Sequence, residues 1–256
     1  MKRYVNAGVI SQEEIAQNIF SMWLDAGQIA AGAVPGQFIS LYSADASRLL
    51  PRPISLCEID REGGRLRIVY RIAGAGTREF SQLRAGDAVR ILGPLGNGYP
   101  LEEKDSRHAL LIAGGIGVPP MLALAKTLQC RKTIILGYRS ERFLLQDFQG
   151  LGEIVTATED GSAGVKGNVM DAIAAAHITG DVIYSCGPKP MLRAVKDLAM
   201  EQHITAWVSL EERMACGIGA CLGCVCESTD VDAHSHVHNK RVCKDGPVFD
   251  AREVVL

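Results

Sequence analysis

The segment Cys216-Gly217-Ile218-Gly219-Ala220-Cys221-Leu222-Gly223-Cys224 is the most distinctive part of this 256-residue sequence. It spaces three cysteines as C-x4-C-x2-C, and a fourth, Cys243, follows after eighteen residues. Plant-type [2Fe–2S] proteins use this spacing to hold two irons with four thiolates. The glycines carry no Cβ atom, so the backbone can approach a flat cluster and aim N–H groups at its sulfurs. The spacing predicts a [2Fe–2S] site with four ligands: Cys216, Cys221, Cys224 and Cys243.

Zinc and disulfides are the alternatives for these cysteines. Zinc also accepts four thiolates, but structural zinc sites favour two knuckles of similar form. Here three closely spaced cysteines are followed by a single distant one. Disulfides are rare in compartments where thiols stay reduced. A fifth cysteine, Cys226, is either a substitute ligand or, as we expect, a packed side chain without a metal.

Length and composition are those of a globular protein with room for two domains and a small appendage. The chain is 47% hydrophobic and 22% charged, as in ordinary soluble proteins. Its formal net charge of -2 gives no electrostatic case for nucleic acid or a membrane surface. The longest apolar run, at 109–125, contains three glycines and two prolines and is too short to span a bilayer. The polar N-terminal segment and the cysteine usage predict a cytoplasmic protein.

Residues 1–101 have the pattern of an antiparallel β-barrel. Segments 38–42, 65–72 and 88–92 alternate or run apolar at strand length, with turn residues between them. Segment 11–24 is ambiguous, because Ser11-Gln12-Glu13-Glu14 matches a helix capping box. We predict a strand there because of the family resemblance described below.

Arg52-Pro53-Ile54-Ser55 is the first candidate binding motif of the barrel. Proline fixes a backbone angle, arginine offers a planar fork to a phosphate, and serine offers a hydroxyl to a polar ring edge. Taken alone, the motif is more simply a surface turn. The glycine-rich turn at 74–77 has the same status: its N–H groups could meet a phosphate, but alone it is only a turn.

The pattern changes after a charged stretch around 101–107, where we place a domain boundary. Residues 109–113 run apolar, as in a buried parallel strand, and a glycine loop leads into a helix that begins at two prolines. Further strands are expected at 133–138, 153–158 and 182–186, with helices at 168–176 and 191–202. The alternation predicts an open parallel sheet with helices on both faces over 102–210.

Two loops at the carboxyl ends of these strands are candidates for a dinucleotide. The strand, glycine loop and helix start at 109–120 can bind a phosphate, although the loop is not the G-x-G-x-x-G fingerprint. Cys186-Gly187-Pro188 ends another strand at the edge where ligands bind. Its thiol could lie against a nicotinamide ring, or it could simply end a strand.

Residues 211–256 form the cysteine module. Between its third and fourth cysteines stand His234, His236 and His238, which would share one face of a strand and could chelate a metal. We favour an exposed polar loop without a metal. Residues 244–250 are expected to end the module in a turn and an edge strand.

Four motifs in this order resemble the ferredoxin–NADP reductase superfamily with an added cluster module. They are Arg-Pro-x-Ser in a barrel, Gly-Gly-x-Gly-x-x-Pro after a strand, Cys-Gly-Pro, and the C-terminal cysteine triple. Segments 211–221 and 242–249 are similar to the cluster segments of electron-transfer subunits of class 1B dihydroorotate dehydrogenase. The resemblance covers essentially the whole chain.

This resemblance implies one cofactor site in each part of the chain. The barrel would bind FAD, with Arg52 at the pyrophosphate and Ser55 at the flavin ring, completed by Pro53, Ile54, Val69, Tyr70, Arg71, Gly76 and Thr77. The α/β domain would bind NAD through Gly114, Gly115, Gly117, Pro119, Cys186, Gly187 and Pro188. The C-terminal module would hold the [2Fe–2S] cluster.

The resemblance also implies a partner, an FMN-containing catalytic subunit that oxidises dihydroorotate in pyrimidine biosynthesis, joined in a heterotetramer of two plus two. Electrons would pass from FMN to the cluster, then to FAD and NAD, because only a flavin exchanges both single electrons and pairs. Hydride transfer needs stacking more than an acid or base, so no catalytic residue is predicted. Two alternatives are a subunit of another NAD(P)H:ferredoxin or sulfide-type oxidoreductase complex, and a zinc-stabilised binding module without redox chemistry.

Overall fold

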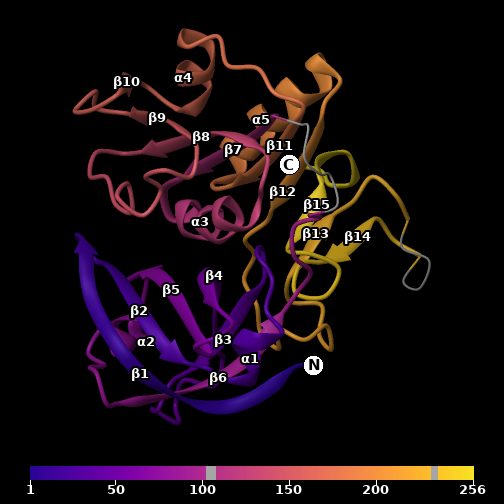
Figure 1. Ribbon diagram of the computed structural model, residues 1–256. Helices are drawn as coiled ribbons and strands as arrows, with labels where there is room; N and C mark the ends of the chain where they lie inside the picture. The colour runs from indigo at the N-terminus through magenta and orange to yellow at the C-terminus, as the bar shows by residue number, and fades with distance from the viewer. Residues whose placement is uncertain (102–107, 232–235) are drawn as a thin grey trace.

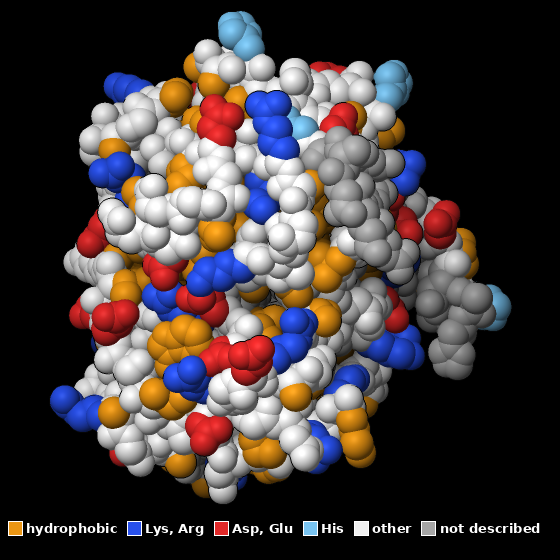
Figure 2. All heavy atoms as spheres, in the orientation of Figure 1, with side chains coloured by type: hydrophobic (Ala, Val, Ile, Leu, Met, Phe, Trp, Pro, Cys, Tyr) orange, Lys and Arg blue, Asp and Glu red, His pale blue; other side chains and the backbone are white. Residues whose placement is uncertain are grey.

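The structure is a computed structural model in which residues 1–101, 108–231 and 236–256 are described. The domain boundary expected at residue 102 and the candidate ligand His234 lie outside the described residues. Figure 1 shows the barrel below, the α/β sheet above, and the C-terminal part alongside both. On the face in Figure 2, basic and acidic side chains are interspersed rather than gathered into a field of one sign.

Six antiparallel strands close into a barrel in the order β1-β2-β5-β4-β3-β6. The core inside it is apolar and includes Met22, Leu41 and Ile68. The predicted barrel is therefore confirmed. Its strands are β1 (Arg3–Ala16), β2 (Ile19–Asp25), β3 (Phe38–Tyr42), β4 (Arg52–Asp60), β5 (Arg65–Arg71) and β6 (Ala88–Leu95), and its two short helices are α1 (Gln28–Ala31) and α2 (Ala75–Phe80).

The ambiguous segment 11–24 is a β-hairpin made by the end of β1 and by β2. The Glu14 carboxylate, which suggested a helix capping box, accepts the N–H of Asn18 at 2.7 Å in the hairpin turn. Met22 and Leu24, two residues apart, both lie in the barrel core. Burial of every second side chain therefore outweighs the local helix signal.

The second domain is built on a sheet in the order β10-β9-β8-β7-β11-β12-β15. Its first six strands are parallel, which confirms the predicted α/β architecture. They are β7 (His108–Gly114), β8 (Arg131–Tyr138), β9 (Glu153–Thr158), β10 (Val165–Lys166), β11 (Val182–Cys186) and β12 (Thr205–Ser209). The sequence pattern did not predict β10 or β12.

Helices cover both faces of this sheet. Leu111 of β7 packs in one core with α3 (Val118–Thr127), while its neighbours Leu110 and Ile112 pack in another core with α4 (Val169–Ala175) and α5 (Lys189–Gln202). This alternation is why 109–113 reads as an unbroken apolar run. No helix of the described residues is long and apolar enough to cross a membrane.

The C-terminal part is held by the sheet of the second domain. Its own strands, β13 (Val225–Glu227) and β14 (Asn239–Arg241), form a small antiparallel pair. The predicted edge strand is β15 (Val248–Asp250), which pairs antiparallel with β12. Val242, Cys243 and Phe249 share a buried core with α5. Residues 211–256 contain all the predicted cluster ligands, but they pack with the second domain instead of folding separately.

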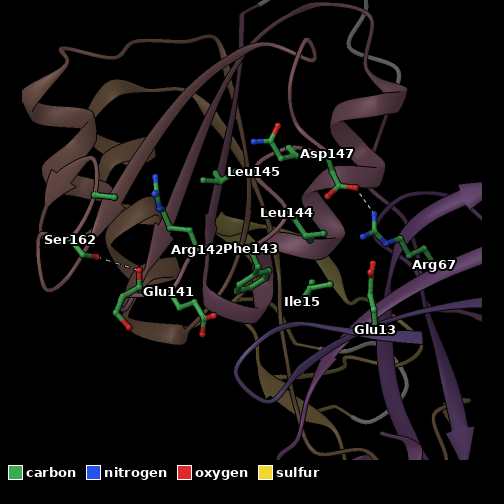
Figure 3. A pocket seen from close by; sticks show the side chains of 13 residues that line it. Glu13, Ile15, Arg67, Glu141, Arg142, Phe143, Leu144, Leu145, Asp147 and Ser162 are labelled. Carbon is green, nitrogen blue, oxygen red and sulfur yellow. Dashed lines mark hydrogen bonds and ion pairs between the residues drawn. The ribbon is translucent and has the colours of Figure 1, made fainter. Parts of the chain in front are cut away.

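An ion-pair network joins the two larger domains. Arg67 of β5 is 7% exposed, and its guanidinium donates to Glu58 Oε1 at 2.6 Å and to Asp147 in the segment after β8. The same Glu58 pairs with Lys126 of α3. Figure 3 shows Arg67 reaching from the barrel to Asp147. The orientation of the domains therefore depends on a buried cation held between two carboxylates.

We predict that Arg67→Met lowers the free energy of unfolding by about 2 kcal/mol, because it removes the buried cation from between two half-buried carboxylates, Glu58 and Asp147. Urea unfolding of the cofactor-loaded protein measures this loss. Arg65→Met is the matched control on the same strand, since the Arg65 side chain is 51% exposed and forms an ion pair with Asp60 of the same hairpin. It should cost less than about 1 kcal/mol. Equal losses of unfolding free energy in the two variants would show that Arg67 does not stabilise the contact between the domains.

Candidate cofactor sites

A cavity of about 390 Å³ lies where the barrel, the α/β domain and the C-terminal part meet. Eight of the nine residues predicted to bind FAD line it: Arg52, Pro53, Ile54 and Ser55 on β4, Val69, Tyr70 and Arg71 on β5, and Thr77 on α2. The ninth, Gly76, lies beside them, because a Cβ atom there would come within 2.9 Å of Arg52 Nε. The structure thus brings the whole predicted set together.

Hydrogen bonds fix the shape of this cavity. The Arg52 guanidinium donates to the carbonyl of Leu50 at 2.7 Å, which holds the side chain at the cavity. The Thr77 hydroxyl accepts the N–H groups of Ala73 at 2.8 Å and Gly74 at 3.2 Å, which shapes the loop before α2. The cavity walls are therefore ordered by the protein's own contacts, a prerequisite for tight binding of a large cofactor.

The Tyr70 ring forms part of the wall without offering its hydroxyl. That hydroxyl donates to Gln12 Oε1 at 2.7 Å, and burial raises the pKa of Tyr70. The ring also stacks on Phe20, with centroids 6.0 Å apart. Tyr70 therefore contributes a fixed apolar surface.

Half of the cavity lining was not predicted from the sequence. It consists of Phe38, Ala73, Ile116, Leu210, Glu211, Glu212, Met214 and Pro247. Four of these eight residues come from the segment that connects β12 to the cysteine triple. The signal in the sequence was the acidic pair Glu211-Glu212 directly before the cysteines. Burial raises the pKa of Glu211, while the nearby charge of Arg71 lowers it in part.

The two loops predicted to bind NAD lie against each other. A Cβ atom at Gly117 would come within 2.2 Å of the carbonyl oxygen of Cys186, so only glycine allows this approach. Gly115 faces the barrel, where a Cβ atom would lie 3.9 Å from Arg71 Nη2. Close packing accounts for Gly117, while Gly115 lies near Arg71, which lines the cavity described above.

The start of α3 offers fewer donors than a typical helix. Its first turn contains Pro119 and Pro120, which have no N–H, and the N–H of Val118 donates to the carbonyl of Gly115. A phosphate at this end would have to use the glycine loop itself, not the helix start that the sequence suggested.

Cys186 is a buried strand-end thiol, 1% exposed. Burial raises its pKa, as does the charge of Glu211, against a hydrogen bond with Ser209. The thiol therefore stays neutral and is not a nucleophile. It can contact a ring but cannot attack one.

The four predicted cluster ligands are arranged as two pairs. Cys216 and Cys221 have their sulfurs 3.3 Å apart, and the N–H of Cys221 points at Cys216 Sγ at 3.4 Å. In the second pair, the N–H of Cys243 donates to Cys224 Sγ at 3.4 Å. Two ligands for each of two irons is the pairing that a [2Fe–2S] cluster requires.

Backbone amides around the first pair stabilise a thiolate. Burial opposes ionisation of Cys216, but the N–H groups of Cys221, Ile218 and Ala220 donate to its sulfur and lower its pKa to about 6. Gly217 and Gly219 have φ of 68° and 88°, the left-handed conformation that lets consecutive N–H groups turn inward. Burial and the neighbouring Cys224 raise the pKa of Cys243 to about 12, so this thiol needs a metal to ionise at neutral pH.

Of the other candidate ligands, Cys226 and His238 make contacts with backbone carbonyls. Among the described residues, no three His, Cys, Asp or Glu side chains converge on a single metal position. Cys226 is 7% exposed and its thiol points at the carbonyl of Lys240. His238 Nδ1 lies 3.2 Å from the carbonyl of Ser228. The paired arrangement suits a two-iron cluster better than a tetrahedral zinc ion.

A larger cavity of about 590 Å³ lies between β1 and the segments after β8 and β9. Figure 3 shows its lining, with Glu13 and Ile15 on the barrel side and Glu141 and Phe143 on the other. No residue of the predicted sites lines it. Size alone therefore does not identify the functional cavity of this chain.

Solved structures share this architecture. An NADH-dependent reduced ferredoxin–NADP oxidoreductase superposes with a TM-score of 0.87 at 27% identity, covering 98% of this chain and 90% of that one. The ferredoxin reductase of carbazole 1,9a-dioxygenase has a TM-score of 0.66 at 18% identity, covers 79% and 67%, and shows the fold alone. The class is that of ferredoxin-reductase-like oxidoreductases with a C-terminal iron–sulfur domain.

Residues 211–255 match the family model of the iron–sulfur cluster binding domain of dihydroorotate dehydrogenase B, and a relative from Geobacillus kaustophilus is 46% identical over 256 residues, covering 97% of both chains. The chain belongs to the family of dihydroorotate dehydrogenase B (NAD(+)) electron transfer subunits. A second member, from Caldanaerobacter subterraneus, is 40% identical over 257 residues and covers 100% of both chains.

We predict that Cys221→Ser removes the cluster while Cys226→Ser keeps it. Cys221 is one of two sulfurs that would hold the same iron, whereas the Cys226 thiol points at a backbone carbonyl. Iron analysis should give about two irons per chain for Cys226→Ser and almost none for Cys221→Ser. If Cys221→Ser keeps about two irons per chain and an unchanged EPR signal of the reduced cluster, Cys221 is not a cluster ligand.

Proposed function

We propose that this chain carries electrons from an FMN-containing catalytic subunit, which oxidises dihydroorotate, to NAD+. The route is the cluster at Cys216, Cys221, Cys224 and Cys243, then FAD in the barrel cavity, then NAD at the edge of the parallel sheet. The step belongs to pyrimidine biosynthesis. In this proposal residues 1–101 bind FAD, 102–210 bind NAD, and 211–256 hold the cluster.

One observation carries the proposal: the wall of the flavin cavity continues into the cluster loop. Leu210, Glu211, Glu212 and Met214 line the cavity, and the first cluster cysteine, Cys216, follows two residues after Met214. Lys189 of α5 pairs with Glu212, which ties this connection to the NAD domain. Two redox cofactors bound here would be neighbours on one short, anchored segment.

Each part of the cavity has a task in this scheme. Arg52 binds the FAD pyrophosphate, because a guanidinium matches phosphate geometry, and Ser55 contacts the edge of the flavin ring. FAD, when bound, supplies a carrier that exchanges electrons singly or as a hydride. Gly115 and Cys186 bring the nicotinamide to the flavin, and the neutral Cys186 thiol positions it. Orientation is the protein's main contribution to such a transfer.

The partner would dock on the cluster side of the chain. The cluster loop exposes Ile218 and Leu222, which are 43% and 63% accessible, and Val225 at 39%. Apolar side chains grouped on an exposed loop are typical of a protein interface. We propose a complex of two copies of this chain with two FMN-containing subunits.

A second candidate function is electron transfer within another NAD(P)H:ferredoxin complex. The likeness to the NADH-dependent reduced ferredoxin–NADP oxidoreductase, at 27% identity over 98% of the chain, favours it. The relatives at 40–46% identity favour dihydroorotate.

Reconstitution with the FMN-containing dihydroorotate dehydrogenase subunit of the same organism tests the function. The purified pair should form one complex and produce NADH from dihydroorotate and NAD+, while neither subunit does so alone. The cluster-free Cys221→Ser chain is the matched control and should fail to support NADH formation. A complex that reduces NAD+ only from reduced ferredoxin would favour the second candidate.

For the flavin site we predict that Arg52→Ala weakens FAD binding by about 2 kcal/mol, or roughly thirtyfold, through loss of a charged hydrogen bond to phosphate. Fluorescence titration of flavin-free protein with FAD measures the change. Arg61→Ala is the control, because Arg61 donates to the carbonyl of Ala33 and does not line the cavity. Equal affinities of Arg52→Ala and wild type would refute the role given to Arg52.

A further inference from the structure

Ser40 is a buried hydroxyl without a partner at the contact between the barrel and the cluster loop. It is 1% exposed, and within the described part of the chain no group lies in hydrogen-bond reach of its Oγ. A buried hydroxyl left unpaired costs stability. Such an atom indicates a partner that the polypeptide itself does not supply.

The position of Ser40 limits what that partner is. Ile39 and Leu41 point into the barrel core, so Ser40, between them on β3, faces outward. A Cβ atom at Gly217 would lie 3.0 Å from Ser40 Oγ. The hydroxyl therefore lies beside the glycine that follows Cys216, in the loop whose N–H groups point at the Cys216 sulfur.

We propose that Ser40 donates a hydrogen bond to a sulfur on the Cys216 side of the cluster and raises its reduction potential. The inference rests on the proposed function, because it requires the cluster to be present. A bound cluster that takes up one electron would gain negative charge on its sulfurs. A donor aimed at sulfur stabilises the reduced form more than the oxidised form. Ser40 is thus a positioning residue of the barrel that tunes a cofactor held by another part of the chain.

Redox titration of the holoprotein, followed by the EPR signal of the reduced cluster, tests this role. Ser40→Ala should shift the reduction equilibrium about tenfold toward the oxidised cluster, which is a potential lower by about 59 mV for a one-electron couple. Ser40→Thr, which keeps the hydroxyl, should restore most of the potential. Ser81→Ala is the matched control, since Ser81 is 9% exposed and its hydroxyl already has a partner, the carbonyl of Arg78.

The alternative acceptor for Ser40 is the flavin, because its strand neighbour Pro53 lines the flavin cavity. An unchanged cluster potential in Ser40→Ala overturns the inference, and so does a shift confined to the flavin. Pulsed EPR of wild type in D2O gives a second measurement: an exchangeable deuteron coupled to the reduced cluster should disappear in Ser40→Ala. Its persistence would also overturn the inference. A wild-type protein without any cluster signal would instead refute the proposed function.

Discussion

The relative position of the two redox sites depends on how residues 243–250 are held. Asn97, just after the barrel, donates its side-chain amide to the carbonyls of Lys244 and Asp245 at 3.2 and 2.9 Å, and its N–H to Gly246 at 2.7 Å. A few residues later β15 pairs with β12 of the parallel sheet. The segment that begins at Cys243, the fourth proposed cluster ligand, is therefore bonded to both domains. Electron transfer needs a constant separation of cofactors, and these bonds supply it.

The same attachment explains why the chain divides poorly into independent parts. Cys224, Cys243 and Phe249 lie in one buried core with Phe38 and Leu95 of the barrel. Removing residues 211–256 would expose apolar surface on both domains and take away one wall of the flavin cavity. Residues 211–256 pack against both larger domains. Their cysteines are therefore positioned by the whole protein and not by the cysteine loop alone.

Local features of the sequence predict some of the candidate residues and miss others. The cysteine spacing and the Arg52–Ser55 motif select residues that stand within a few positions of one another, and the fold then brings these groups together. The part of the cavity lining that was not predicted depends on Leu210 and Pro247 lying beside Phe38, more than a hundred residues away in the sequence. No periodicity encodes such a contact, since it follows from domain docking through Arg67 and Asn97. The hairpin at 11–24 shows the same limit, because tertiary burial overrides a local capping signal.

The outer face of β3 provides a second structural link between the cavity and the proposed cluster loop, besides the segment from Leu210 to Met214. Phe38 lines the cavity, Ser40 contacts the loop at Gly217, and Tyr42 lies close enough to Cys216 for the thiolate charge to contribute to its raised pKa, after burial and Tyr4. Four residues of strand span about 13 Å. The strand is paired on both edges, with β4 and β6, so this spacing cannot change without opening the barrel. If FAD and the cluster bind where we propose, this strand would keep a fixed spacing between them whichever partner supplies the electrons.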